Sequence, residues 1–152
     1  MNVNRPCAIA IAVIITWGCG EPLDELTPYV SRYQNFQDLN EKLERYHGYL
    51  KSPALERQAR DIRVVIQAYS DSFENVELGK DKFIRASHNN VKRALARALT
   101  QLVEPDFPRF TISAQKQVNL IKDKVNEHYG NLDKLWNESG KTDPFPLNWP
   151  KL

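Results

Sequence analysis

Histidine and glutamate side chains offer the clearest opportunity for metal chemistry in this chain of 152 residues. Helical bundles build di-iron centres from inward-facing carboxylates and a Glu-x-x-His pair on each of two helices. Glu44 and His47 have this spacing, whereas Val125 stands three residues before His128. His47 and His128 are therefore candidate metal ligands. The single pair, and the lack of carboxylates at inward positions, instead favour ordinary histidines of a helical core.

The sequence shows no residue pattern typical of an enzyme. Nucleophilic catalysis requires a serine or cysteine activated by a neighbouring base, and no such constellation is visible. Residues 139–142 match the end of a phosphate-binding loop, but Leu135 stands where the first glycine of that loop is required. A Cys-x-x-Cys-His motif for covalent haem is also missing. We therefore expect a protein that is not an enzyme and carries no cofactor.

Residues 1–20 have the layout of a secretory signal peptide. Arg5 gives a charged start, an apolar run extends from Cys7 to Trp17, and small residues follow. The run is about half as long as the roughly twenty residues of a membrane-spanning helix, so export followed by cleavage is favoured. The chain has two cysteines. Removal of the run leaves Cys19 unpaired in an oxidising compartment, where an odd cysteine needs another role.

The stretch 15–19, Ile-Thr-Trp-Gly-Cys, resembles the lipobox of bacterial lipoproteins, in which a small residue precedes the cysteine that is acylated. Gly18 and Cys19 carry the match. The resemblance implies that residues 1–18 are removed and that acyl chains on Cys19 anchor the protein, each buried methylene contributing about 0.8 kcal/mol. Gly20 and Glu21 follow Cys19, so no aspartate stands in the second place of the mature chain. In this family, that implies a lipoprotein sorted to the outer membrane and facing the periplasm. The alternative is cleavage after Gly20, which gives a soluble secreted protein.

Charge is distributed unevenly along the chain, although the net charge is only +2. This small net charge gives no reason to expect a nucleic-acid partner. Between Lys80 and Ala98, however, six basic residues stand against Asp81 alone. The candidate basic contact face consists of Lys82, Arg85, Lys92, Arg93 and Arg97. Such a face could bind anionic lipid headgroups or an acidic partner, and the alternative is a solvated surface paired with acidic neighbours.

Four amphipathic helices account for most of the remaining chain. Thr27-Pro28 and Ser52-Pro53 each place a capping side chain before a proline, which predicts two helix starts. A third helix is predicted from about Asp81, and a fourth from Thr111 to a stop at Gly140. Inward positions recur at spacings of three and four residues. They are Tyr29, Tyr33, Phe36, Asn40, Leu43, His47 and Leu50, then Leu55, Ala59, Ile62, Ile66, Tyr69, Phe73 and Val76, then Ile84, Ser87, Val91, Leu95, Ala98 and Leu102, then Val118, Ile121, Val125, His128, Leu132 and Leu135.

The predicted fold class is all-α, because no stretch alternates β-branched or aromatic residues with polar ones. Four helices joined by short turns favour an up-down-up-down four-helix bundle. Gly130 is expected to weaken or bend the fourth helix. Three prolines follow Gly140, so the C-terminal tail is predicted to be extended. Its Phe145 and Trp149 are candidates for contact with a partner, and the alternative is that they lie across the bundle with Leu147.

The predicted organisation has four parts. They are a signal peptide at 1–18, a lipid-anchored tether at 19–26, the bundle at 27–139 and the tail at 140–152. These features predict a non-enzymatic, lipid-anchored protein of the cell envelope that binds a protein partner near the membrane. The basic third helix and the tail are its candidate contact surfaces. The alternative is a small-molecule or metal carrier that uses the bundle interior around His47 and His128.

Overall fold

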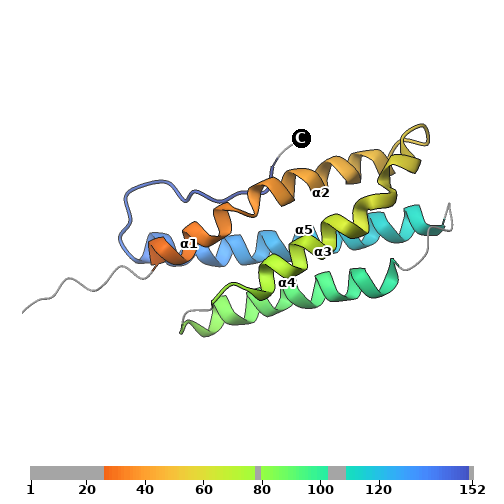
Figure 1. The fold of residues 1–152 in the computed structure, drawn as a ribbon. Coiled ribbons are helices and arrows are strands. Elements are labelled where there is room, and N and C mark those ends of the chain that lie inside the picture. Colours follow the sequence, from red (N-terminus) through yellow and green to blue (C-terminus); the bar gives the residue numbers. More distant parts are fainter. Residues whose placement is uncertain (1–25, 78–79, 103–108, 151–152) are drawn as a thin grey trace, which may run out of the picture.

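The structure is a computed structural model, which describes residues 26–77, 80–102 and 109–150. All regular structure in this part of the chain is helical, and the predicted all-α four-helix bundle is confirmed. The elements in chain order are α1 (Leu26–Gln34), α2 (Gln37–Leu50), the 3-10 helix η1 (Glu56–Asp61), α3 (Ile62–Glu74), α4 (Lys82–Gln101) and α5 (Arg109–Glu138). They form four rods, because α1 continues into α2 and η1 continues into α3 (Figure 1).

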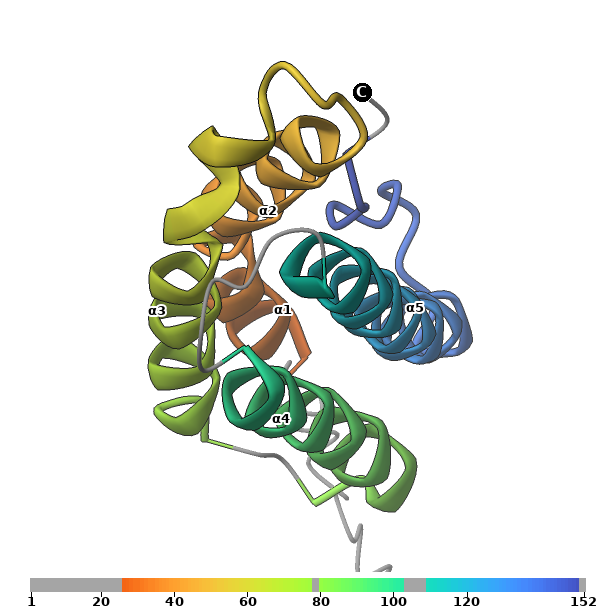
Figure 2. The same cartoon turned by 90° about the vertical axis from the view of Figure 1, so that its right-hand side faces the viewer.

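Each of the four helical rods packs against the next one in the chain, and the fourth also packs against the first. Helix α2 contacts α3, α3 contacts α4, α4 contacts α5, and α5 contacts α2. Figure 2 shows this closed arrangement from the end of the bundle, with α4 on one side of α5 and the C-terminal segment on the other. Helix α5 therefore has one seam with α4 and a second with α2.

The first rod corrects the prediction of a single uninterrupted helix. Asn35 and Phe36 form a turn between α1 and α2, and the Phe36 N–H donates to the Tyr33 carbonyl at 3.0 Å. This step of three residues is tighter than the four-residue step of an α-helix. Every predicted inward position of this rod is nevertheless buried, from Tyr29 to Leu50.

The second rod begins later than the Ser52-Pro53 pattern predicts. The Leu55 N–H donates to the Ser52 carbonyl at 2.9 Å, so this segment opens as a turn. A 3-10 helix follows, and α-helical structure starts only at Ile62. The prediction that Leu55 faces the core is wrong, because a residue ahead of the regular helix does not share its periodicity. From Ala59 to Phe73 the predicted positions are buried.

The ends of the last two rods follow their sequence signals. A carboxylate oxygen of Asp81 accepts the N–H groups of Phe83 and Ile84 at 2.8 and 2.9 Å, which caps α4. Helix α5 continues through Gly130 and ends before Gly140, whose φ of 76° lies in the left-handed region that glycine adopts readily. The predicted start and stop are therefore confirmed.

Rings from α1, α3, α4 and the turn before α2 fill much of the core. The Phe73 ring centroid lies 4.8 Å from that of Phe36, 5.7 Å from that of Tyr33 and 4.7 Å from that of His88. All four residues are buried. Such close aromatic contacts stabilise a core beyond the burial of their apolar area.

Candidate functional site

The predicted lipidation site, Cys19, lies outside the residues that the structure describes, as does the whole lipobox-like stretch. Within residues 26–77, 80–102 and 109–150, no helix has both the length and the apolar character needed to cross a membrane.

The residues of the predicted basic face of α4 differ in exposure and in ion pairing. Arg85, Arg93 and Arg97 are exposed, and so is Lys82, whose ammonium lies 5.1 Å from the centroid of the Phe83 ring. Lys92 differs, because it is half-buried and its ammonium lies 2.6 Å from the Glu74 carboxylate on α3. Lys92 thus joins α3 to α4, and the remaining cations are available on the surface.

A groove follows the outer side of the seam between α4 and α5. We define the α4/α5 groove by Arg93 and Arg97 of α4 and by Ile112, Lys116, Leu120 and Lys124 of α5. It consists of two adjoining depressions, of about 490 and 230 Å³, which share Arg97 and Leu120 in their linings. Lys116 and Lys124 were not predicted as site residues, since nothing in the sequence tells which flank of α5 faces α4.

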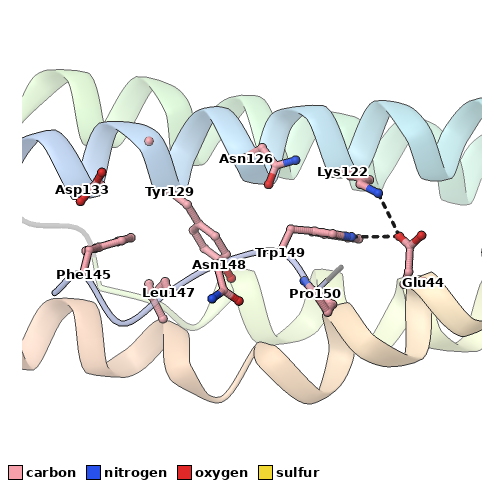
Figure 3. A pocket seen from close by; sticks show the side chains of 11 residues that line it. Glu44, Lys122, Asn126, Tyr129, Asp133, Phe145, Leu147, Asn148, Trp149 and Pro150 are labelled. Atoms are coloured by element: carbon pink, nitrogen blue, oxygen red, sulfur yellow. Dashed lines mark hydrogen bonds and ion pairs between the residues drawn. The ribbon is translucent and has the colours of Figure 1, made fainter. Parts of the chain in front are cut away.

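The C-terminal segment occupies the opposite seam, between α2 and α5. Trp149 is only 7% exposed, and its indole N–H donates to the Glu44 carboxylate at 2.9 Å (Figure 3). The Lys122 ammonium donates to the same oxygen at 3.3 Å and lies 5.8 Å from the centroid of the Trp149 ring. Leu147 is buried beside them. The structure therefore places Trp149 against the bundle.

Glu44 is the centre of this arrangement. Burial raises the pKa of its carboxyl group, but hydrogen bonds from Trp149 and Lys122 outweigh this effect and hold the pKa below its ordinary value. The carboxylate stays charged at neutral pH and accepts both donors, which gives stronger hydrogen bonds than neutral partners would. Phe145 is half-buried, with its ring centroid 6.2 Å from that of Trp136.

Replacing Trp149 with phenylalanine is expected to loosen the C-terminal segment without unfolding the bundle. The Trp149→Phe variant keeps an aromatic ring but removes the donor to Glu44, and a hydrogen bond to a charged group contributes about 1.5–3 kcal/mol. Limited proteolysis should cut within residues 141–150 at least about tenfold faster than in the wild type. Val64→Ala, on the exposed side of α3, is the control and should change nothing. Equal cleavage of Trp149→Phe and wild type would contradict the role of the indole N–H.

The two candidate metal ligands lie in different clusters of side chains. Nδ1 of His47 is 3.8 Å from the Glu44 carboxylate, and burial together with the nearby charge of Lys51 lowers the pKa of His47. Nδ1 of His128 is 2.7 Å from the Ser87 hydroxyl. Among the described residues, no group of three or more His, Cys, Asp or Glu side chains is placed to hold a metal ion. His47 and His128 therefore do not belong to a common metal-binding cluster in the described part of the chain.

His128 belongs to a buried polar cluster that the sequence did not indicate. The Ser87 hydroxyl lies 3.1 Å from the Ile84 carbonyl and 2.7 Å from His128, and Nε2 of His128 has no hydrogen-bond partner among the described residues. Nδ1 of His88 lies 2.9 Å from the Tyr33 hydroxyl. Ser87 and His128 are residue types of a nucleophile and its base, but both side chains are buried in the bundle.

The exposed cations of the α4/α5 groove are therefore the candidate functional site. Neither a protein-family model, nor a curated protein, nor a solved structure matches this chain. Arg97 and Lys116 form no ion pair with any residue that the structure describes, whereas Lys122, on the other flank of α5, is paired with Glu44. The unpaired cations leave this side of the molecule with a local positive charge.

Proposed function

We propose that the protein is a non-enzymatic, lipid-anchored accessory of the cell envelope that binds a protein partner through the exposed basic face of α4. The observation that carries this proposal is the set of exposed arginines on α4. Arg85, Arg93 and Arg97 have no carboxylate partner among the described residues. Exposed charges of one sign attract a partner of the opposite sign and speed its association.

The anchor places this face near a membrane. Acylated Cys19 would hold the chain, and residues 20–25 would link it to the start of α1 at Leu26. In the proposed arrangement the protein is attached to the outer membrane and faces the periplasm. Several acyl chains on one cysteine hold a protein firmly, because each buried methylene adds about 0.8 kcal/mol.

Crosslinking in the native envelope tests both parts of this proposal. The protein is expected in the membrane fraction with the mass of residues 19–152 plus acyl chains, and crosslinked to one partner in constant ratio. Arg93→Glu/Arg97→Glu should reduce the crosslinked yield about tenfold, because repulsion replaces attraction at two positions. Lys42→Glu/Arg45→Glu makes the same change of charge on the exposed side of α2, and is the matched control.

Two results would contradict the proposal. Recovery of an unmodified chain that begins at Glu21 would contradict the proposed lipid anchor at Cys19. Absence of any partner in constant ratio, or an equal loss of crosslinked yield in both double variants, would contradict partner binding by the α4 face.

A further inference from the structure

The α4/α5 groove has cations on both of its walls. Arg93 and Arg97 stand on α4, and Lys116 and Lys124 stand on α5. Among the described residues that line the two depressions, Asp123 supplies the single carboxylate. An anionic group lying along the groove would therefore meet positive charge from two helices at once.

These cations differ in their existing partners. Lys124 donates to the Glu127 carboxylate at 2.6 Å, and the Arg93 guanidinium donates to the side-chain oxygen of Asn90. Arg97 and Lys116 form no ion pair with the described residues. The centre of the groove, where Arg97 lines both depressions, thus carries charge that the described part of the chain does not compensate.

Two large apolar side chains line the groove among polar ones. Leu120 is half-buried and lines both depressions, and Ile112 is 68% exposed at one end. A partner that covers Ile112 and Leu120 removes apolar surface from water, which contributes roughly 25 cal/mol per Å². The groove therefore offers apolar side chains and cations to the same partner.

The length and shape of the groove select the kind of partner. From Ile112 to Lys124 it follows α5 for about 18 Å, the length of a helix of roughly twelve residues. A hollow between two antiparallel helices accepts the apolar stripe of a third helix, with charged side chains on either side of that stripe. A flat bilayer surface does not enter such a hollow.

We infer that the α4/α5 groove binds an acidic amphipathic helix of a partner protein, with its apolar stripe on Leu120 and Ile112 and its carboxylates on Arg97 and Lys116. This inference rests on the proposed function, because it names the chemistry of the partner that the basic face binds. It also extends the contact surface from α4 to α5, which carries Lys116 and Lys124.

Binding of a labelled peptide with the expected chemistry tests the inference. The probe is a fluorescein-labelled, helix-forming peptide of about 14 residues, with leucines on one face and glutamates on either side of them. Fluorescence anisotropy should show saturable binding to the full chain. Arg97→Glu/Lys116→Glu should weaken binding at least about tenfold, whereas Lys42→Glu/Arg45→Glu, with the same change of net charge, should leave it within about twofold.

Two control peptides separate the contributions of charge and shape. Replacing the glutamates of the probe with lysines should abolish binding, and replacing its leucines with serines should weaken it severalfold. Equal binding of the lysine peptide, or equal loss in both double variants, would overturn the inference. Vesicles rich in phosphatidylglycerol test the other anionic surface, and vesicle binding that needs Arg97 and Lys116 without any peptide binding would also overturn it.

The peptide experiment and the envelope crosslinking fail independently. If a partner is recovered from the envelope and its binding depends on Arg93 and Arg97, but the acidic peptide does not bind, the proposed role of the groove is wrong and the proposed function is retained. If the acidic peptide binds but no partner is recovered, helix binding in the groove is retained and the proposed accessory function is wrong.

Discussion

Lowering the pH from about 7 towards 3 is expected to destabilise the folded bundle by several kcal/mol, because two buried histidines must then take up protons. His88 is 1% exposed and His128 is fully buried. Burial lowers the pKa of His88 to about 4, and the nearby charge of Lys92 adds to this effect, while the charge of Glu74 opposes it. Burial, together with the neighbouring His88, lowers the pKa of His128 to about 3.

The direction of the effect follows from proton uptake. In the unfolded chain both histidines have the ordinary pKa of 6.5, so between 6.5 and the lowered values the unfolded chain binds more protons than the folded one. The free energy of unfolding therefore falls as the pH falls through this window. The lowered values correspond to on the order of 3 kcal/mol for His88 and 5 kcal/mol for His128. They do not simply add, since the ring centroids are 5.7 Å apart and two charged rings would repel one another.

Urea unfolding at a series of pH values measures this loss. His88→Asn and His128→Asn each keep a polar atom near the position of Nδ1 but do not titrate, so each should reduce the slope of unfolding free energy against pH. Phe73→Leu is the control, because it alters packing beside both rings and removes no titrating group. Slopes are compared rather than absolute stabilities, since every variant loses some packing. Equal slopes in the wild type and both histidine variants would contradict the prediction.

The second large effect is expected at Asn40, which joins three helices through buried hydrogen bonds. Its side-chain oxygen accepts the Tyr69 hydroxyl at 2.6 Å, and its amide donates to the Tyr129 hydroxyl at 3.1 Å. All three side chains are buried. Leucine has a similar size, but Asn40→Leu removes the acceptor of the Tyr69 hydroxyl and the donor to the Tyr129 hydroxyl. A buried unsatisfied polar group costs about 1–3 kcal/mol. We expect the free energy of unfolding to fall by about 2–3 kcal/mol.

A second substitution separates the lost hydrogen bond from altered packing. Asn40→Leu/Tyr69→Phe also removes the Tyr69 hydroxyl that has lost its acceptor, so it should recover at least about 1 kcal/mol relative to Asn40→Leu. The Tyr129 hydroxyl lacks its Asn40 donor in both variants, so its loss does not affect this comparison. Chemical denaturation of the wild type, both single variants and the double variant completes the cycle. If the double variant is less stable than Asn40→Leu, the loss comes from packing and the hydrogen-bond explanation is wrong.

Which residues face the core could largely be predicted from the sequence. Spacings of three and four residues place one side of each helix inward, and burial of Tyr29 through Leu50 follows that rule even across the turn at Asn35 and Phe36. The turn itself was not predictable by the same means. Neither residue is a glycine or proline, and the periodicity of the inward positions is unchanged across it.

The candidate site could be predicted only in part. The charge bias of α4 is local in sequence, and it indicated Arg93 and Arg97 correctly as exposed cations. Lys116 and Lys124 join them because α5 lies antiparallel to α4 in one particular register, which no local pattern specifies. The contact of Trp149 with Glu44 likewise joins residues that are 105 positions apart.

Two contacts between residues that are far apart in the sequence have a consequence for the proposed export. Lys141 donates to the Thr27 hydroxyl at 2.8 Å, and Trp149 donates to Glu44 at 2.9 Å, so these contacts form only after residues 141–149 have been synthesised. Until Trp149 leaves the ribosome, the growing chain lacks the contact with Glu44 that holds this segment between α2 and α5. Under the proposed export, the precursor would stay unfolded for longer before it enters a translocation channel, and it would acquire its full stability only on the far side of the membrane.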